Sequence, residues 1–408
     1  MIKGKSVTQT HWYFKLFNSI KEEHEIDFAE LELQSLFGSV ARVHNFVDIL
    51  HNTPFRNFME TTRIQDMFAH ELPYGRWQGF YAETDDFRDV SLLVQRLAYT
   101  REIYMLIEHR NPRLLLGEVF PTGEIDRNVQ LYEINGYCLL RFITHQYFLE
   151  KSQYISKLSR NEMEVDANIK SLFSFLTKTL YRIPATVTMR VGKRLEDYFT
   201  IREEPSLYLT HYMHPYKGRF HPKMVRALLN YVFPEESGFV MDNFAGCGTL
   251  LVEATLMGLD SVGVEINPLS VLMSNVKCHS LIIRPEGLKD TVKSYLKELE
   301  ENLLIRQKQL AGNTLLFPPS YDESVIEKRK IGIPDKVVSM LKSTEIIDKV
   351  LIAQDLINKQ HNERMRDFLL LGLSGTISDL ARRRQADFLE VLRDRLHDLY
   401  LRIYIFHQ

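Results

Sequence analysis

Two glycines and an acid follow consecutive apolar runs in the middle of the chain. Gly246 and Gly248 come after the run that ends at Asp242, and Glu265 ends the next run, nineteen residues after Gly246. Glycine at such a turn lets a ligand approach the backbone, and helix amides face it. In a β-α-β unit, a carboxylate at the end of the second strand lies beside the first turn and can accept hydrogen bonds from ribose hydroxyls. The spacing therefore predicts a site for a nucleoside-containing cofactor.

The glycine pattern also limits which cofactor fits. A dinucleotide site needs G-x-G-x-x-G, but the third glycine is missing from GCGTLL at residues 246–251. The phosphate-binding pattern G-x-x-x-x-G-K-[ST] is absent from the sequence, which argues against a P-loop. Asp242 would repel a phosphate and attract an ammonium group. An adenosine with a cationic amino-acid tail satisfies all of these conditions, and S-adenosyl-L-methionine is such a molecule.

The segments around these residues are predicted to form the β-α-β unit that the site requires. The expected elements are a helix over 221–233, a strand over 238–244, a helix over 249–258 and a strand over 261–267. Pro222 suits the first turn of a helix, and Thr249 is a natural N-cap. Such a unit implies a parallel, doubly wound sheet.

These residues carry a resemblance to a known family. MDNFAGCGTLLVEATLMGLDSVGVEINPLSVLMSNVK, residues 241–277, resembles the D-P-F-x-G-x-G-T motif and following strand of S-adenosylmethionine-dependent methyltransferases that act on amino groups of nucleic-acid bases. HPYKGRFHPKMVRALL, residues 214–229, looks like the upstream cofactor motif of the DNA amino-methyltransferases. Residues 27–38 and 93–108 look like the N-terminal unit of the tRNA guanine-N2 methyltransferases, which includes ferredoxin-like and THUMP domains. The resemblance implies methylation of DNA adenine N6 or cytosine N4, with tRNA guanine N2 as the alternative.

The resemblance also implies a role for each residue of the site. Asp242 would meet the methionine ammonium group, and Glu265 would hold the ribose hydroxyls. The expected cofactor-binding residues are Asp242, Phe244, Ala245, Gly246, Gly248, Thr249, Glu265, Ile266 and Asn267, with Phe220 and His221 from the upstream motif. Asn243 replaces the usual proline and Cys247 the usual serine or glycine. Neither change is expected to abolish binding, because backbone approach depends on the flanking glycines.

The catalytic motif of these families is not found in the sequence. The resemblance implies a [DNST]-P-P-[YFW] motif, in which polar groups accept the amine hydrogens and an aromatic ring stacks on the flipped base. The nearest string, FPPSYDES at 317–324, has Phe317 in the polar position and Ser320 in the aromatic position. We interpret it as an ordinary Pro-Pro turn. The chain stops within an apolar periodic run, so we expect the motif beyond Gln408 or on a second chain.

The remaining sequence predicts an N-terminal α+β module and a C-terminal helical block. The N-terminal elements are strands over 11–17, 41–50 and 79–84, a helix over 26–38, and a helix over 89–108 that carries Leu92, Leu93, Leu97 and Ile103 toward a core. A hairpin around Asn135-Gly136, a helix over 166–180 and a strand over 185–191 follow. Beyond 284, two stripes predict helix packing within the chain: Leu288, Val292, Tyr295, Leu299 and Leu303, and then Leu389, Leu392, Leu396, Leu399 and Ile403.

We therefore expect an α/β protein with four parts. The first two are a ferredoxin-like α+β module over 1–115 and a second α+β region, similar to a THUMP domain, over 116–205. The other two are the cofactor-binding half of a Rossmann-like methyltransferase domain over 206–283 and a truncated helical insertion over 284–408. The methyltransferase domain is expected to be incomplete at its C-terminus.

Composition excludes several other classes of protein. The 408 residues carry a formal net charge of −2 and are 45% hydrophobic, so any nucleic-acid surface must be a local one. Three cysteines without C-x-x-C spacing support neither a disulfide framework nor a zinc ribbon. His211, His214 and His221 are close in sequence, but no cysteine or acid completes a ligand set, so no metal is expected. Without a signal peptide or a long apolar run, the expected location is the cytoplasm, with no membrane partner.

Overall fold

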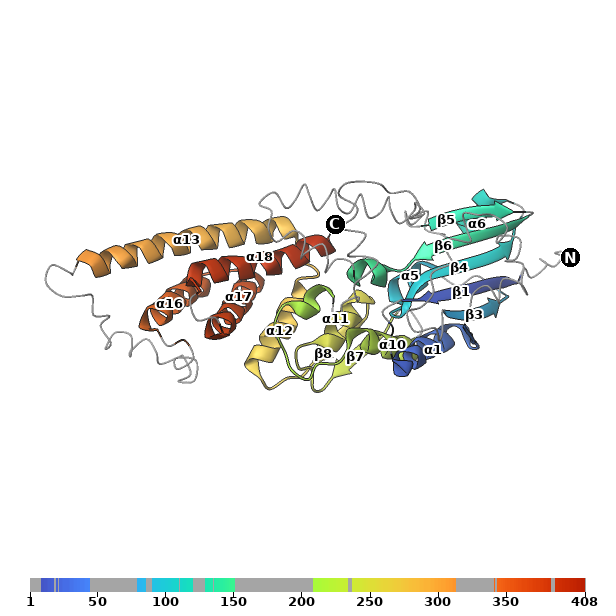
Figure 1. Cartoon of the computed structure of the whole chain (residues 1–408), viewed down its shortest axis with the longest axis horizontal. Helices are drawn as coiled ribbons and strands as arrows, with labels where there is room; N and C mark the ends of the chain where they lie inside the picture. Colours follow the sequence, from blue (N-terminus) through green and yellow to red (C-terminus); the bar gives the residue numbers. More distant parts are fainter. Residues whose placement is uncertain are drawn as a thin grey trace. The chain divides into compact units, whose positions relative to one another are not determined.

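The structure is a computed structural model of the chain (Figure 1). It describes residues 9–17, 20, 22–44, 79–85, 90–109, 111–119, 129–134, 136–150, 208–233, 237–312, 341, 343–382 and 386–407. These residues fall into two compact units. The first unit takes its residues from 1–208, 220–243 and 249–263, and the second from 209–219, 244–248 and 264–408. We describe each unit by itself.

A six-stranded sheet with antiparallel neighbours dominates the first unit (Figure 1). Its strands are β1 (Thr10–Leu16), β2 (Ala41–Val43), β3 (Gly79–Thr84), β4 (Thr100–Glu108), β5 (Val129–Ile134) and β6 (Tyr137–Ile143), in the order β2-β3-β1-β4-β6-β5. β1 and β2 flank helix α1 (Glu23–Phe37) in sequence, and β3 lies between them in the sheet. β3 and β4 flank α5 (Val90–Arg96), with β1 between them. Each set is thus a split β-α-β unit.

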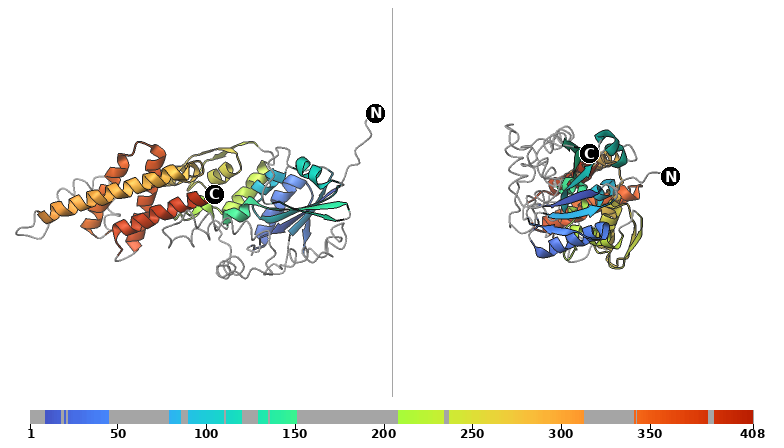
Figure 2. Two further views of the ribbon diagram at one scale, coloured as in Figure 1. Left: turned by 90° about the horizontal axis from the view of Figure 1, so that it is seen from above. Right: turned by 90° about the vertical axis from the view of Figure 1, so that its right-hand side faces the viewer.

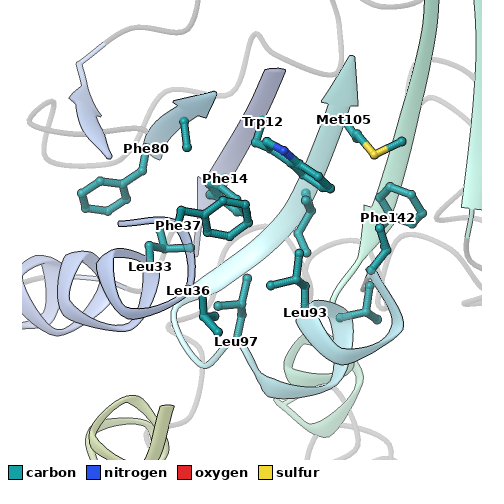
Figure 3. Close-up of a cluster of buried hydrophobic side chains, with 14 of the residues drawn as sticks. Trp12, Phe14, Leu33, Leu36, Phe37, Phe80, Leu93, Leu97, Met105 and Phe142 are labelled. Carbon is teal, nitrogen blue, oxygen red and sulfur yellow. The ribbon is translucent and has the colours of Figure 1, made fainter. Parts of the chain in front are cut away.

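The core of this unit lies between the sheet and its helices. Alternation along β1 directs Trp12 and Phe14 to the helical side, where Phe37 of α1 packs with ring centroids 5.6 Å from Trp12 and 4.8 Å from Phe14. Figure 3 shows Leu33 of α1 and Leu93 of α5 in the same cluster. Burying each such side chain contributes about 1.5–3 kcal/mol, so this cluster fixes both helices on one face of the sheet.

Most of the predicted N-terminal elements are confirmed. The strands predicted over 11–17 and 79–84 correspond to β1 and β3, the helix over 26–38 to α1, and the hairpin to β5 and β6. The strand over 41–50 is confirmed for Ala41–Val43. His44 lies in a bend after this strand, and residues 45–50, the helix over 166–180 and the strand over 185–191 lie outside the described residues.

The single helix predicted over 89–108 is wrong in its second half. α5 ends at Arg96, and Ile103 reaches the core from β4. The helix ends early because of a residue distant in sequence. The Glu32 carboxylate accepts hydrogen bonds from the amides of Ala98 and Tyr99, both at 3.0 Å. Those amides are therefore not used to continue the helix.

The same carboxylate links α1 to helix α10 (Pro222–Val232). Asn230 of α10 donates to Glu32 over 3.1 Å and to the carbonyl of Arg96 over 3.1 Å, and Ser35 of α1 donates to the carbonyl of Asn230 over 3.1 Å. Two turns earlier, Lys223 pairs with the buried Glu150 at 2.5 Å. A buried polar stripe along α10 thus fastens it to the N-terminal sheet module.

Unfolding of the first unit is expected to depend on the protonation of Glu32. Burial raises the pKa of Glu32 from 4.5 to about 7, so the folded state binds a proton that the unfolded state has lost. The free energy of unfolding should therefore fall by up to about 3 kcal/mol as the pH rises from about 4.5 to about 7. Urea titrations followed by tryptophan fluorescence at several pH values, on the wild type and on Glu32→Gln, isolate this contribution. Parallel pH profiles for the two proteins would contradict it.

The predicted β-α-β unit is present in the first unit. β7 (Phe239–Asp242) and β8 (Asp260–Gly263) pair in parallel, from Phe239↔Asp260 to Asp242↔Gly263, and α11 (Thr249–Leu256) connects them. α10 and α11 cover one face, where Val240 is buried. The described parallel sheet has two strands, so the class is confirmed as mixed α/β, while a full Rossmann-like domain stays a prediction.

The second unit is largely helical. Its elements are the short 3-10 helix η3 (Leu209–Tyr212), α12 (Pro268–His279), α13 (Pro285–Gly312), α16 (Thr344–Asn358), α17 (Glu363–Arg382) and α18 (Phe388–Phe406). α13 and α18 run side by side, and α17 packs against α18 and α12 (Figures 1 and 2). Of the two predicted stripes, Leu288, Val292, Tyr295, Leu299, Leu392, Leu396, Leu399 and Ile403 are buried. None of the helices in the described ranges is long and apolar enough to cross a membrane. The four-part division of the chain stays a prediction.

Candidate cofactor site

The glycine-rich turn belongs to the second unit, and we call residues 244–248 the glycine loop. Gly246 and Gly248 have φ angles of +52° and +79°, which residues with a side chain rarely adopt. The amide of Gly248 donates to the carbonyl of Ala245 over 2.8 Å, and the amide of Ala245 donates to the carbonyl of Val264 over 3.0 Å. The loop is thus a tight turn tied to the segment that carries Glu265.

Glu265 lies beside the loop, as its spacing predicts. Its Oε2 accepts from the amide of Gly246 over 2.8 Å, and its Oε1 accepts from the amides of Ile266 at 3.0 Å and Asn267 at 2.9 Å. These N–H groups, that of Asn267 foremost, hold the pKa of Glu265 below its ordinary value. The carboxylate is therefore ionised at neutral pH, and Oε2 has capacity for a second donor such as a hydroxyl.

Two exposed apolar side chains flank these polar groups in the sequence. Phe244 is 91% exposed and Ile266 is 97% exposed, whereas Ala245 between Phe244 and Gly246 is buried. Asn267 caps helix α12, its side-chain oxygen accepting from the amide of Leu269 over 3.0 Å. An ionised acceptor next to uncovered apolar surface suits a ligand with both hydroxyls and a flat apolar ring. The residues present therefore fit an adenosine-containing cofactor.

Tyr216 is a site residue that the sequence analysis did not single out. A Cβ atom built on Gly246 would lie 3.3 Å from the Tyr216 hydroxyl, so this ring covers one side of the loop. Tyr216 lies within the 214–229 segment that resembles an upstream cofactor motif, and that resemblance was the available signal.

Gly248 has a packing role besides the ligand contact that we predicted. A Cβ atom there would lie 2.8 Å from the hydroxyl oxygen and 3.0 Å from the Cα of Ser274, on α12. Helix α12 also bonds to the loop directly, because Ser274 donates to the carbonyl of Gly246 over 3.1 Å and Lys277 to the carbonyl of Cys247 over 2.8 Å. Two side chains from one face of α12 thus hold the backbone of the glycine loop.

The other predicted site residues belong to the first unit. Asp242 ends β7 and is partly exposed. Thr249 is buried and is the first residue of α11, so it is not the N-cap that we expected. Phe220 is 67% exposed, and His221 caps α10 through its backbone, its carbonyl accepting from the amide of Val225 over 3.1 Å.

Within the described residues, no group of three or more histidine, cysteine or acidic side chains is arranged to hold a metal ion. His214 bonds to the carbonyl of Pro215 at 3.0 Å and to the hydroxyl of Ser374 at 3.3 Å. Cys138, Cys247 and Cys278 are not joined in disulfides. The Pro-Pro string at 317–324 lies outside the described residues.

Comparison with known proteins confirms the resemblance to nucleic-acid methyltransferases. The chain is 36% identical over 103 residues to the Type II methyltransferase M.MjaII of Methanocaldococcus jannaschii, which is 25% of this chain and 17% of that protein. It is 29% identical over 126 residues to the tRNA (guanine(10)-N2)-dimethyltransferase of the same organism, which is 30% of this chain and 34% of that protein. It is 26% identical over 183 residues to the Type II methyltransferase M.MvaI of Kocuria varians, which is 44% of this chain and 36% of that protein.

These matches show similarity to nucleic-acid methyltransferases, but they leave the substrate open. The similarity reaches both Type II methyltransferases and a tRNA methyltransferase, so it does not choose between them. The matched parts span about a third or less of each relative, at 17%, 34% and 36% of their lengths. No protein-family model matches the chain.

Proposed function

We propose that the protein takes part in methyl transfer from S-adenosylmethionine to an exocyclic amino group of a nucleic-acid base. The observation that carries this proposal is the 2.8 Å hydrogen bond between the amide of Gly246 and the carboxylate of Glu265, in a loop whose apolar neighbours Phe244 and Ile266 are uncovered. The similarity to nucleic-acid methyltransferases supports the same chemistry.

The residues of the site have separate tasks in this proposal. Glu265 accepts hydrogen bonds from the ribose hydroxyls, and Phe244 and Ile266 cover apolar parts of the cofactor. Asp242 attracts the methionine ammonium group, and Asn267 flanks the adenine. The bound cofactor supplies a methyl group activated by its sulfonium charge. The groups that accept the hydrogens of the target amine are expected on a [DNST]-P-P-[YFW] motif beyond Gln408 or on a second chain.

For the substrate, we propose DNA, with methylation at adenine N6 or cytosine N4. The upstream segment over 214–229, which resembles the cofactor motif of DNA amino-methyltransferases, supports this choice. The alternative is tRNA guanine N2. The N-terminal sheet favours this alternative, because the tRNA guanine-N2 methyltransferases that the sequence resembles include a ferredoxin-like domain. The element order β1-α1-β2-β3-α5-β4 and the strand order β2-β3-β1-β4 support such a module here.

Radiolabelled methyl transfer tests the function and separates the substrates. The purified protein is incubated with S-adenosylmethionine labelled in its methyl group, and with either unmethylated duplex DNA or unmodified tRNA. Incorporation into DNA supports the first choice, and incorporation into tRNA alone supports the second. Cofactor binding without transfer to either would point to a subunit that binds the cofactor but does not catalyse the reaction by itself.

We also propose that further polypeptide, from a second chain or from a continuation of this one, completes the methyltransferase domain. Parallel sheets are usually covered on both faces. The face of β7 and β8 opposite to α10 and α11 has Phe239, Met241 and Val262 exposed by 64%, 58% and 42%. Reading the encoding DNA past codon 408 tests the source. An in-frame [DNST]-P-P-[YFW] motif supports a continuation, and a stop codon directs the search to a partner chain.

A further inference from the structure

Helix α12 buries one polar face next to the glycine loop. Ser270, Ser274 and Lys277 are spaced four and three residues apart, so they share this face, and they are 0%, 5% and 0% exposed. Lysine is among the residues least often fully buried, because its ammonium group loses strong hydration. A fully buried lysine beside a proposed ligand site therefore calls for a physical explanation.

Lys277 holds one peptide group of the glycine loop in place. Its Nζ donates to the carbonyl of Cys247 over 2.8 Å. The amide on the other side of that peptide bond, that of Gly248, donates to the carbonyl of Ala245 over 2.8 Å. Because a peptide group is planar, these two bonds fix its orientation from both ends. The adjoining peptide carbonyl, that of Gly246, accepts from Ser274 over 3.1 Å.

This arrangement acts on the predicted cofactor site through the backbone. With the carbonyls of Gly246 and Cys247 turned toward α12, the amide of Gly246 is placed to bond to Glu265 over 2.8 Å. Losing the Lys277 bond would free the peptide between Cys247 and Gly248 to rotate. The turn would then lose the geometry that brings Gly246 to Glu265.

Burial is the largest influence on the charge of Lys277. Among the described residues, its strongest electrostatic neighbours are Cys247, Arg219 and Cys278, and it in turn acts on His214. None of these four groups is a carboxylate. Burial lowers the pKa of Lys277, so the side chain is retained at an electrostatic cost. An apolar residue of similar length would avoid that cost but would not bond to the loop.

We propose that Lys277 is a positioning residue that holds the glycine loop in its ligand-binding conformation through the carbonyl of Cys247. The part of this inference that concerns cofactor affinity rests on the proposed function. The part that concerns the conformation of the loop does not, and the two are measured separately.

The first measurement uses Cys247 as an internal reporter without any cofactor. The Cys247 residue is 2% exposed, so its alkylation by iodoacetamide requires the loop to open. Lys277 also interacts with the Cys247 side chain, so the uncharged Lys277→Met is compared with Lys277→Arg, which keeps the positive charge. We expect Lys277→Met to raise the rate of Cys247 alkylation at least tenfold, by peptide mass spectrometry, and Lys277→Arg to return it toward the wild-type rate. Cys138, 0% exposed in the first unit, reports unfolding of that unit and should react equally slowly in every variant. Far-UV circular dichroism checks that the helices of the second unit stay folded in each variant. Lys293→Met, at an exposed position on α13, is the matched control.

The second measurement is the affinity for S-adenosylhomocysteine by calorimetry. We expect Lys277→Met to bind at least tenfold more weakly than the wild type, with Lys277→Arg and Lys293→Met close to the wild type. Unchanged alkylation of Cys247 in Lys277→Met would overturn the proposal. Faster alkylation with unchanged affinity would overturn the link to the cofactor. Faster alkylation in a protein whose wild type binds no S-adenosylhomocysteine would support the positioning role and contradict the proposed function.

Discussion

Replacing Gly248 with valine is expected to weaken cofactor binding about a hundredfold. The φ of +79° disfavours any side chain by about 1–2 kcal/mol. A Cβ atom would also lie 2.8–3.0 Å from atoms of Ser274, including its Cα, and overpacking of this kind costs about 1–3 kcal/mol. Together these costs come to about 2–5 kcal/mol, and about 3 kcal/mol, near the middle of that range, is roughly a hundredfold in affinity. Calorimetric titration with S-adenosylhomocysteine measures the loss.

A matched glycine separates backbone strain from steric overlap. Gly258 has a similar φ of +74°, but a Cβ atom there meets nothing within 4 Å. Gly258→Val should therefore bind the cofactor much as the wild type does. Combining Gly248→Ala with Ser274→Gly should recover part of the affinity that Gly248→Ala alone loses, because the second change removes the overlapping side chain. Equal affinities for Gly248→Val and Gly258→Val would show that the loop does not need its observed packing.

The second large effect is expected at a buried ion pair in the first unit. Arg226 of α10 is 1% exposed and donates to Glu253 of α11 over 2.6 Å and to Gln146 over 3.1 Å. The hydroxyl of Tyr208 donates to the other oxygen of Glu253 over 2.8 Å. Arg226→Met leaves a carboxylate buried without its cation, which costs about 3–5 kcal/mol. We expect that loss in the free energy of unfolding, from urea titrations followed by tryptophan fluorescence.

The same substitution at an arginine that reaches solvent is the control for this prediction. Arg42 has Glu23, Asp27 and Glu30 as partners, but its side chain is 27% exposed. Water screens such pairs, so Arg42→Met should cost about 1 kcal/mol or less. Adding Glu253→Met to Arg226→Met should restore part of the stability, because no unpaired charge then remains buried. If Arg226→Met were no more damaging than Arg42→Met, the buried pair would not stabilise the packing of α10 on α11.

Local patterns in the sequence predicted the parts of the site whose partners are near in the chain. The apolar run before Gly246 and the run that ends at Glu265 became parallel strands, and the predicted closeness of these two residues is seen as their 2.8 Å hydrogen bond. α1 was predictable because its apolar spacing and its terminal Gly38, with a φ of +75°, are local signals.

Features that depend on distant residues could not be predicted in this way. The helix predicted over 89–108 stops early because Glu32, more than sixty residues upstream, binds the amides of Ala98 and Tyr99. The support of the glycine loop by Ser274 and Lys277 spans about thirty residues, and no motif announces it. The exposed state of Ile266 likewise follows from packing and not from residue type.

Equilibrium binding of S-adenosylmethionine to the wild type and to Glu265→Ala, measured by calorimetry at pH 7.5, tests the proposed cofactor site. We expect saturable one-to-one binding by the wild type. We expect an affinity about 10–100 times weaker for Glu265→Ala, because charge-assisted hydrogen bonds contribute about 1.5–3 kcal/mol. Glu286→Ala, at an exposed position in the first turn of α13, should bind as the wild type does. Absence of saturable binding by the wild type, or equal affinity for Glu265→Ala, would show that Glu265 does not hold the cofactor.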